Sequence, residues 1–153
     1  MIFVPEPGPS GYRHVGSVPF RTMTDGSRHV PCVGGIVHDD AGRLLLVQRA
    51  NEPGAGRWSV PGGRVEPGET DHEAVVRELA EETGLLVTPG PLVGRVVRGP
   101  FDIADYRCEP AGGRLAAGDD ALDARWVDAA EFERLPLVDG LAETLGGWGV
   151  LPR

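Results

Sequence analysis

The segment that most constrains this chain is residues 63–85, where a glycine-containing loop runs into one well-delimited helix; it reads GRVEPGETDHEAVVRELAEETGL. Thr70 and Glu73 have the spacing of a capping box, in which each side chain binds a backbone N–H at the start of a helix. Gly84 stands where helices commonly end in a left-handed residue. We therefore expect a helix between Thr70 and Gly84.

The expected helix has two different faces. At about 100° per residue, the apolar side chains form one stripe, made of Val75, Val76, Leu79 and Ala80. Positions three and four apart are neighbours on a helix, so the adjoining arc carries three carboxylates, those of Glu78, Glu81 and Glu82. Ala74 lies on the same arc and leaves space there. We expect the stripe to pack on a sheet while the carboxylates look out over its edge.

Two interpretations of these carboxylates compete. Glutamate is common on solvated helix faces, and like charges one turn apart cost only about a few tenths of a kcal/mol. The alternative is a metal site, because Gly62-Gly63 would let the backbone come close to the carboxylate face. Carboxylate and carbonyl oxygens together are the ligands that hard cations such as Mg²⁺ or Mn²⁺ prefer. The glycines beside the glutamates favour the metal site.

The segment resembles the Nudix box at every specified position of that motif. Gly63 is followed after five residues by Glu69, and seven residues later the chain reads RELAEETGL at 77–85. The flanks agree with the resemblance. WSVPGG at 58–63 precedes the box, and AGDDALDARWV at 117–127 is similar to the later acidic loop and tryptophan-bearing strand of the family. The implied fold is α/β, an α/β/α sandwich with a mixed β-sheet that carries the loop–helix–loop of the box.

The resemblance also implies roles for individual residues. Glu78, Glu81 and Glu82 would bind one to three Mg²⁺ ions, with Mn²⁺ as an alternative, helped by the backbone carbonyl of Gly62. Arg77 would orient these carboxylates and pair with Glu69, and its neighbours Glu73 and Glu81 fit that role. Arg49 matches a position that contacts phosphate in relatives, although a surface arginine is an equal alternative. Our candidates for substrate binding are Arg49, Phe101 and Asp120.

The implied activity is hydrolysis of a pyrophosphate linkage, in which metal ions neutralise charge and a carboxylate takes the proton of the attacking water. Glu81 is the first candidate for this base, and four aspartates stay open: Asp102, Asp105, Asp119 and Asp120. The expected substrate is a nucleoside diphosphate linked to another moiety, ADP-ribose-like first and a nucleoside triphosphate second. Three aromatic side chains could stack on a base, although core packing is the commoner use: Trp58, Phe101 and Tyr106.

Two other functional classes stay open at this stage. One is a non-catalytic sensor that binds nucleotides, and loss of a box carboxylate would have pointed to it. The other is an interaction module in which the helix glutamates are only a solvated face. Because the box is intact, we expect an enzyme.

Composition limits the partners. A chain of 153 residues with a net charge of −8 is expected to form one domain that avoids nucleic acid and anionic membranes. A nucleotide ligand is compatible with this charge, since bound cations would reverse the local field. Cys32 and Cys108 lack metal-ligand spacing and should be buried free thiols. The first residues show no signal-peptide pattern, which favours a cytoplasmic protein.

The order of turn signals and apolar runs predicts two parts. Residues 1–28 are rich in proline and glycine and should be irregular, packed on the domain, or reach across a homodimer. The expected domain is 29–153. Its predicted strands are 29–38, 43–49, 58–60, 92–98, 101–108 and 124–127, with turns at 39–42 and at Gly112-Gly113. Besides the box helix, 128–135 should be helical and 140–145 weakly so.

Overall fold

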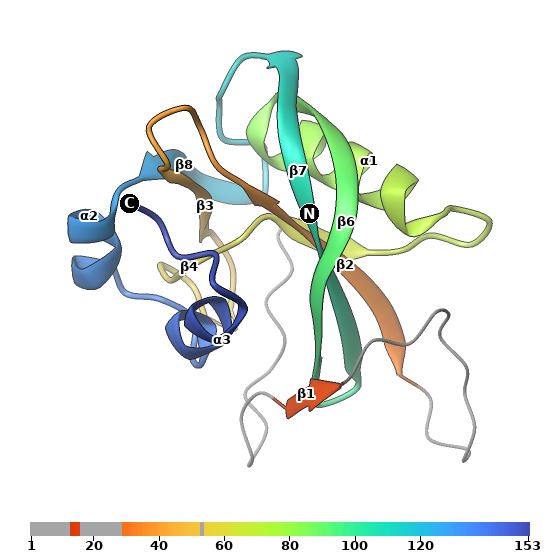
Figure 1. Cartoon of the computed structure of the whole chain (residues 1–153). Coiled ribbons are helices and arrows are strands. Elements are labelled where there is room, and N and C mark those ends of the chain that lie inside the picture. The colour runs from red at the N-terminus through yellow and green to blue at the C-terminus, as the bar shows by residue number, and fades with distance from the viewer. Residues whose placement is uncertain (1–12, 16–28, 53) are drawn as a thin grey trace.

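A five-stranded mixed sheet forms the centre of the molecule (Figure 1). The computed structural model describes residues 13–15, 29–52 and 54–153. Within them, the order of strands in the large sheet is β1-β6-β7-β2-β5. β2 runs parallel to β7, while the other neighbours are antiparallel. The strands are β1 (Arg13–Val15), β2 (Val30–Val37), β5 (Gly62–Arg64), β6 (Leu85–Arg98) and β7 (Phe101–Gly113).

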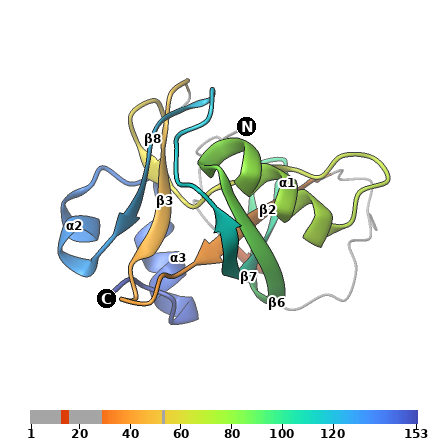
Figure 2. The ribbon, with the colours of Figure 1, turned by 90° about the horizontal axis from the view of Figure 1, so that it is seen from above.

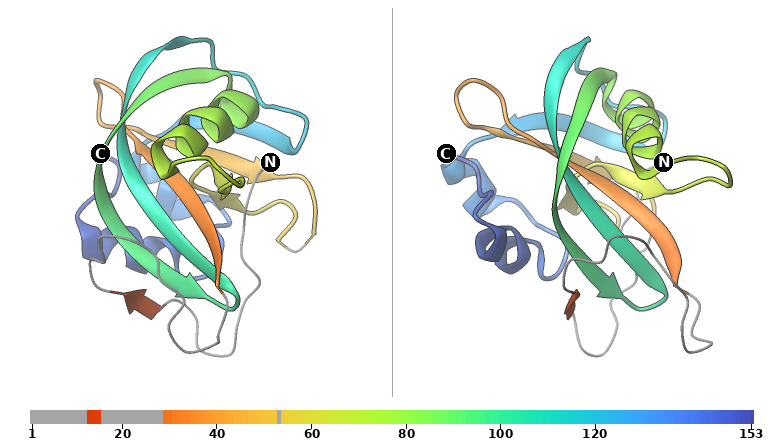
Figure 3. Two further views of the ribbon diagram at one scale, coloured as in Figure 1. Left: turned by 90° about the vertical axis from the view of Figure 1, so that its right-hand side faces the viewer. Right: turned by 45° about the vertical axis from the view of Figure 1, so that its right-hand side comes forward.

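A second, antiparallel sheet and three helices complete the layers. The small sheet has the order β4-β3-β8, with β3 at Leu44–Arg49, β4 at Trp58–Ser59 and β8 at Ala121–Val127. The helices are α1 (Asp71–Thr83), α2 (Ala129–Arg134) and α3 (Leu141–Trp148). Figures 2 and 3 show α1 on one side of the large sheet and the small sheet with α2 and α3 on the other. This arrangement confirms the predicted α/β sandwich with a mixed sheet.

The ends of α1 are those expected from the sequence. The Thr70 side chain accepts a hydrogen bond from the Glu73 N–H, and the Glu73 carboxylate accepts one from the Thr70 N–H. At the other end Gly84 has φ of 72°, a left-handed conformation that suits glycine. Local signals alone therefore define this helix.

The large sheet buries apolar side chains on both of its faces. Val33 and Val37 face α1 and pack in one cluster with Leu79. Ile36 points the other way and packs with residues of α3 and the small sheet. Gly35 leaves room for α1, because a Cβ there would lie 2.8 Å from Leu79 Cδ2. Since both faces are covered, β2 is buried along most of its length.

Several strand predictions were wrong in their extent or pairing. β6 begins at Leu85 rather than near Leu92, and Gly112-Gly113 belongs to β7, where it pairs with Leu85 and Leu86 instead of turning. The strands at 30–37 and 44–49 are joined only by the His38–Leu44 bridge and then enter different sheets. The diglycine at 62–63, expected as a bend, is part of strand β5.

Predictions for the first residues are tested only in part. β1 is a short strand inside the segment 1–28 that we expected to be irregular. Residues 1–12 and 16–28 lie outside the described residues, so packing of this segment on the domain stays a prediction. None of the helices in the described part of the chain combines the length and apolar character that crossing a membrane requires.

Removing the side-chain cap of α1 tests how much the cap contributes to the free energy of unfolding. Thr70→Ala deletes the acceptor for the Glu73 N–H, so we expect the free energy of unfolding to fall by about 1 kcal/mol. Urea denaturation followed by circular dichroism would measure this change. Thr88→Ala, at an exposed position of β6, is the control and should stay within about 0.5 kcal/mol of the parent. Equal losses in both variants would contradict a role for the cap.

Candidate metal and phosphate site

Strand β5 brings backbone against the carboxylates of α1. A Cβ at Gly63 would collide with the Glu78 carboxyl group, and one at Gly62 would collide with the Val33 carbonyl. Glycine is required at both positions, because a side chain at Gly63 would separate α1 from β5 and one at Gly62 would separate β5 from β2. The close approach expected from the sequence is therefore present, although a strand and not a bend provides it.

Gly62 presents both of its backbone polar groups to the carboxylate side. The Gly35 N–H donates to the Pro61 carbonyl at 3.0 Å, so Gly34 and Gly62 form a pair without mutual hydrogen bonds. The Gly62 N–H and C=O therefore point away from β2. The N–H donates to Glu82 Oε2 at 3.1 Å. The carbonyl lies on the same side, where it could serve as a metal ligand.

Two of the three predicted ligands are deeply buried. The exposed fractions of Glu78 and Glu82 are 2% and 1%, whereas the Glu81 side chain is 50% exposed. The expectation that all three carboxylates look out over the sheet edge was wrong. Ala74, expected beside them on that arc, is buried in the apolar cluster with Val75. Two carboxylates of the helix therefore face the interior: Gly63 leaves space for Glu78, and the Gly62 N–H binds Glu82.

Burial changes the acid–base behaviour of Glu82. Loss of hydration raises the pKa of Glu82 to about 9, and the neighbouring Glu78 charge acts in the same direction. The Gly62 N–H opposes this rise because it binds the ionised carboxylate. A carboxylate in such surroundings gains most from a nearby positive charge.

Arg77 connects the loop, the helix and the strand. Its guanidinium donates to both Glu69 oxygens, at 2.7 and 2.9 Å, and to Glu78 Oε1 at 2.8 Å. It also donates to the Arg64 carbonyl at 3.0 Å and reaches Glu81 Oε2 at 3.5 Å. The hydrogen bonds from Arg77 lower the pKa of the Glu69 carboxyl group. The predicted contacts with Glu69 and Glu81 are present, whereas Glu73 serves the helix cap.

The loop before β8 packs on the end of α1. The N–H groups of Ala116 and Gly118 each donate at 2.9 Å, to the Thr83 and Glu82 carbonyls respectively. The next two residues are Asp119 and Asp120. The Asp120 carbonyl accepts from the Ala50 N–H at 3.4 Å. This contact places Asp120 beside the end of β3 that carries Arg49, so the fold brings two predicted substrate-binding residues together near α1.

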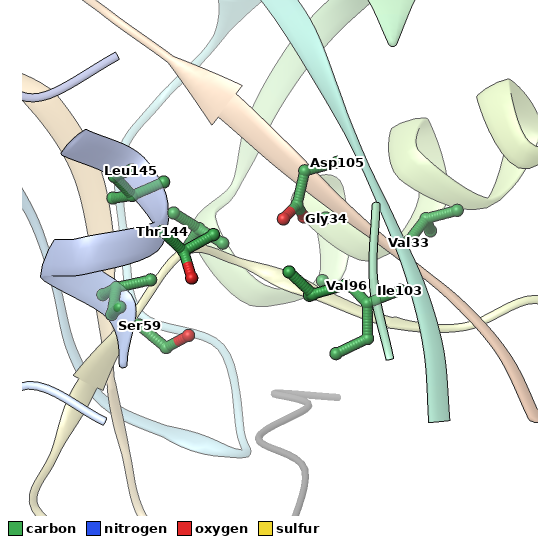
Figure 4. Close-up of a pocket in the computed structure, with 11 residues that line it drawn as sticks. Val33, Gly34, Ser59, Val96, Ile103, Asp105, Thr144 and Leu145 are labelled. Carbon is green, nitrogen blue, oxygen red and sulfur yellow. The ribbon is translucent and has the colours of Figure 1, made fainter. Parts of the chain in front are cut away.

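The other candidate aspartates lie on β7. The Oδ1 atom of Asp102 lies 3.6 Å from Arg95 Nη1. Asp105 is buried and is paired with Gly34 of β2. Asp105 faces a cavity of about 30 Å³ between the large sheet and α3, where Ser59 and Thr144 supply hydroxyl groups (Figure 4). Gly62 also lines this cavity, which joins it to the carboxylate site. Space of this size holds about one water molecule.

The three aromatic candidates occupy different surroundings. Trp58 belongs to the core, and Arg125 lies over its ring at 5.2 Å from the centroid. The Tyr106 hydroxyl donates to Asp71 Oδ2 at 2.6 Å. Phe101 is half-buried at the start of β7, with the Arg64 guanidinium 5.7 Å from its centroid. Of the three, Phe101 remains a candidate for stacking.

Comparison with known proteins agrees with this geometry. A NUDIX domain matches residues 28–145, which is most of the chain.

The chain belongs to the NUDIX family.

Individual relatives differ in their described substrates. The chain is 41% identical over 109 residues to an ADP-ribose pyrophosphatase of Methanocaldococcus jannaschii, a match that covers 67% of this chain and 64% of that protein. It is 40% identical over 95 residues to the human 8-oxo-dGDP phosphatase NUDT18, covering 61% of this chain and 29% of the relative. The chain thus spans less than two thirds of the length of both relatives.

Solved structures agree with the fold. The crystal structure of a MutT NUDIX hydrolase from Burkholderia pseudomallei has a TM-score of 0.66 at 26% identity, covering 78% of this chain and 97% of that one. These findings confirm the predicted family and the predicted fold.

The residues of this NUDIX site have the ligand chemistry that a hard divalent cation requires, but their side chains do not converge on one position. Among the described residues, no three histidine, cysteine, aspartate or glutamate side chains converge as ready-made ligands. Glu78 is held by Arg77 and Glu82 by Gly62, while Glu81 is half exposed. The donors nevertheless include two buried carboxylates and a carbonyl, which are the ligand types such cations select.

Some residues beside the site had no signal in the sequence. Ser59 lies inside the WSVPGG run, but its contact with the cavity depends on how the two sheets pack. Thr144 is in the α3 helix, far from the box in sequence, and no motif marks it. Arg64 lies within the box, but at a position the motif does not specify.

Glu82 should make the stability of the metal-free protein fall as pH rises. Its pKa is about 9 in the folded chain and near 4.5 when unfolded, so folding favours the protonated form. The contribution is fully present below about pH 4.5 and is lost as pH rises towards 9. Urea denaturation in EDTA across this range should show a decline that Glu82→Gln largely removes. Glu81→Gln, at an exposed position, should leave the decline intact; an unchanged slope in Glu82→Gln would refute this assignment.

Proposed function

We propose that this NUDIX protein hydrolyses a phosphoanhydride bond in a nucleoside diphosphate linked to another moiety, using divalent cations held by the carboxylates of α1. The observation that carries the proposal is the burial of Glu78 and Glu82 one turn apart beside β5. Two such carboxylates lose hydration and repel each other, which is costly without a compensating cation. A purely structural helix would gain more from apolar side chains at these positions.

The roles in this proposal follow from the contacts of each side chain. Glu78, Glu81 and Glu82, with the Gly62 carbonyl, hold the cations, with Mg²⁺ as first choice and Mn²⁺ as the alternative. When bound, such cations neutralise phosphate oxygens and lower the pKa of coordinated water. Arg77 acts through the carboxylates it orients, since its guanidinium already binds Glu69 and Glu78. It is a positioning residue.

The general base has one favoured candidate. Glu81 is half exposed and only weakly held by Arg77, at 3.5 Å, so it can turn towards a water molecule. Asp119 and Asp120 are the next candidates because their loop packs on the end of α1. Asp102 and Asp105 are less suitable, as they lie on β7, away from the helix end. We therefore propose that Glu81 takes the proton of the attacking water.

An ADP-ribose-like molecule is the first choice of substrate. This choice is supported by the similarity to an ADP-ribose pyrophosphatase. The moiety attached to the diphosphate would lie beside the cavity that Gly62 shares with the carboxylate site. Because that cavity holds about one water molecule, Ser59, Asp105 and Thr144 would contact this moiety through a bridging water, while Arg49 and Asp120 would contact the phosphate side. Phe101 would provide an aromatic surface at the outer end.

A nucleoside triphosphate, including an oxidised one, is the second candidate. The observation that favours it is the similarity to a putative 8-oxo-dGTP diphosphatase of Mycobacterium tuberculosis, which is 38% identical over 117 residues. A non-catalytic nucleotide sensor is the alternative class, and saturable binding by calorimetry without turnover would favour it. Cytoplasmic location and homodimer formation stay predictions from the sequence.

A substrate panel with paired variants tests the proposal. We expect turnover of ADP-ribose or a nucleoside triphosphate with Mg²⁺ or Mn²⁺, and none in EDTA. Glu78→Gln and Glu82→Gln should each lower kcat by about 100-fold or more, because they remove a charge that stabilises the transition state. Product analysis in ¹⁸O-labelled water would identify the phosphorus attacked.

Two controls separate chemistry from folding. Glu133→Gln, at an exposed position of α2, should leave kcat unchanged. Thr70→Ala should lower stability with little effect on kcat. Unchanged turnover in Glu82→Gln, or no product from any member of the panel, would overturn the proposal.

A further inference from the structure

A basic hollow lies at the end of β2 that is remote from the carboxylate site. It has a volume of about 240 Å³ and is lined by His38, Arg107, Arg153, Gly42 and residues 149–151. This volume is several times the roughly 30 Å³ that one water molecule occupies in the liquid. Gly34 is paired with Gly62, and His38 lies four residues further along the extended chain. The hollow is therefore about 13 Å from Gly62 along the strand direction.

The two arginines of the hollow form no close ion pairs within the described part of the chain. Arg107 and Arg153 form no ion pair with any carboxylate of the described residues, although the whole chain carries a net charge of −8. The nearest acidic neighbour in sequence, Asp39, is bound to Arg43 at 2.7 Å. Two guanidinium groups that line one small hollow repel each other, and an anion bound in the hollow would relieve this repulsion.

The fold holds these groups in place before any ligand arrives. Arg107 on β7 is paired with Ile36 on β2, so the two side chains project from the same face of the large sheet. The Arg153 N–H donates to the Gly42 carbonyl at 2.9 Å, and its backbone oxygen accepts from the Ala129 N–H at 3.2 Å. The stem of Arg153 rests on Gly42, where a Cβ would lie 3.0 Å from it. The basic side chains therefore extend from fixed backbone.

His38 adds an oriented ring to the same hollow. Its Nε2 lies 3.0 Å from the Val150 carbonyl, and a carbonyl only accepts, so Nε2 carries a proton. The carbonyls at the end of α3 do not oppose an anion strongly, because Leu145 and Gly146 already accept from the N–H groups of Gly149 and Val150.

We propose that this hollow is an anion site that binds a phosphate group, separate from the catalytic carboxylates. Arginine binds phosphate oxygens through paired N–H donors, and two arginines match a tetrahedral dianion in charge. The ligand is either inorganic phosphate or the terminal phosphate of a phosphomonoester. The site does not depend on the proposed hydrolysis, since none of its residues belongs to the carboxylate site.

The test uses metal-free protein, in which the acidic catalytic face repels phosphate. ¹⁵N-labelled protein in EDTA is titrated with inorganic phosphate, and separately with AMP, at constant ionic strength maintained with chloride. We expect saturable shifts of the backbone amide signals of Gly42, Gly149, Val150 and Leu151. Arg107→Gln and Arg153→Gln should each weaken binding about tenfold, and the double variant should abolish it.

Arg134→Gln is the matched control, since this exposed arginine lies on α2 outside the hollow. It should leave phosphate affinity unchanged. Shifts with AMP but not with phosphate, confined to other amides, would overturn the proposal, as would equal affinity in the double variant. Undisturbed signals elsewhere in the spectrum would show that the variants are folded, and the result is independent of whether the protein hydrolyses any nucleotide.

Discussion

The buried pair of carboxylates between α1 and β5 is the constraint on which the rest of the structure depends. Glu78 can lie there only because Gly63 carries no side chain, and the Glu82 carboxylate is bound by the Gly62 N–H. Once buried, they need partners, and the fold supplies Arg77 on one side and the Gly62 N–H on the other. The positions of helix, strand and loop are therefore set by the electrostatic needs of two charged groups as much as by apolar packing.

The part of the fold that local chemistry determines could be predicted from the sequence. The bounds of α1 follow from Thr70, Glu73 and Gly84, each of which acts on its own backbone neighbourhood. The ion pair between Arg77 and Glu69 was also expected, from the family pattern. The buried thiols of Cys32 and Cys108 were likewise anticipated from the apolar alternation around them.

Features that depend on contacts between residues distant in the sequence could not be predicted in this way. Gly112-Gly113 has the composition of a turn, yet pairing with Leu85 and Leu86 extends it as a strand. The separation of β2 and β3 into different sheets depends on what covers each face, which a pattern of alternation does not specify. Ser59 and Thr144 meet at one cavity only after α3 packs on the large sheet. The inward rotation of Glu78 likewise required the neighbouring strand.

The loop 114–118 completes the end of α1 with main-chain hydrogen bonds from Arg114, Ala116 and Gly118. Leu115 packs against both apolar clusters and Gly118 is fixed sterically by the Glu81 carbonyl, so the exposed side chains of the loop are not needed to hold it. The two positions that follow it therefore sit on a scaffold that tolerates exchange. If Asp119 and Asp120 contact the substrate as proposed, single replacements at these two positions would change ligand recognition without disturbing the helix that carries the acidic triplet.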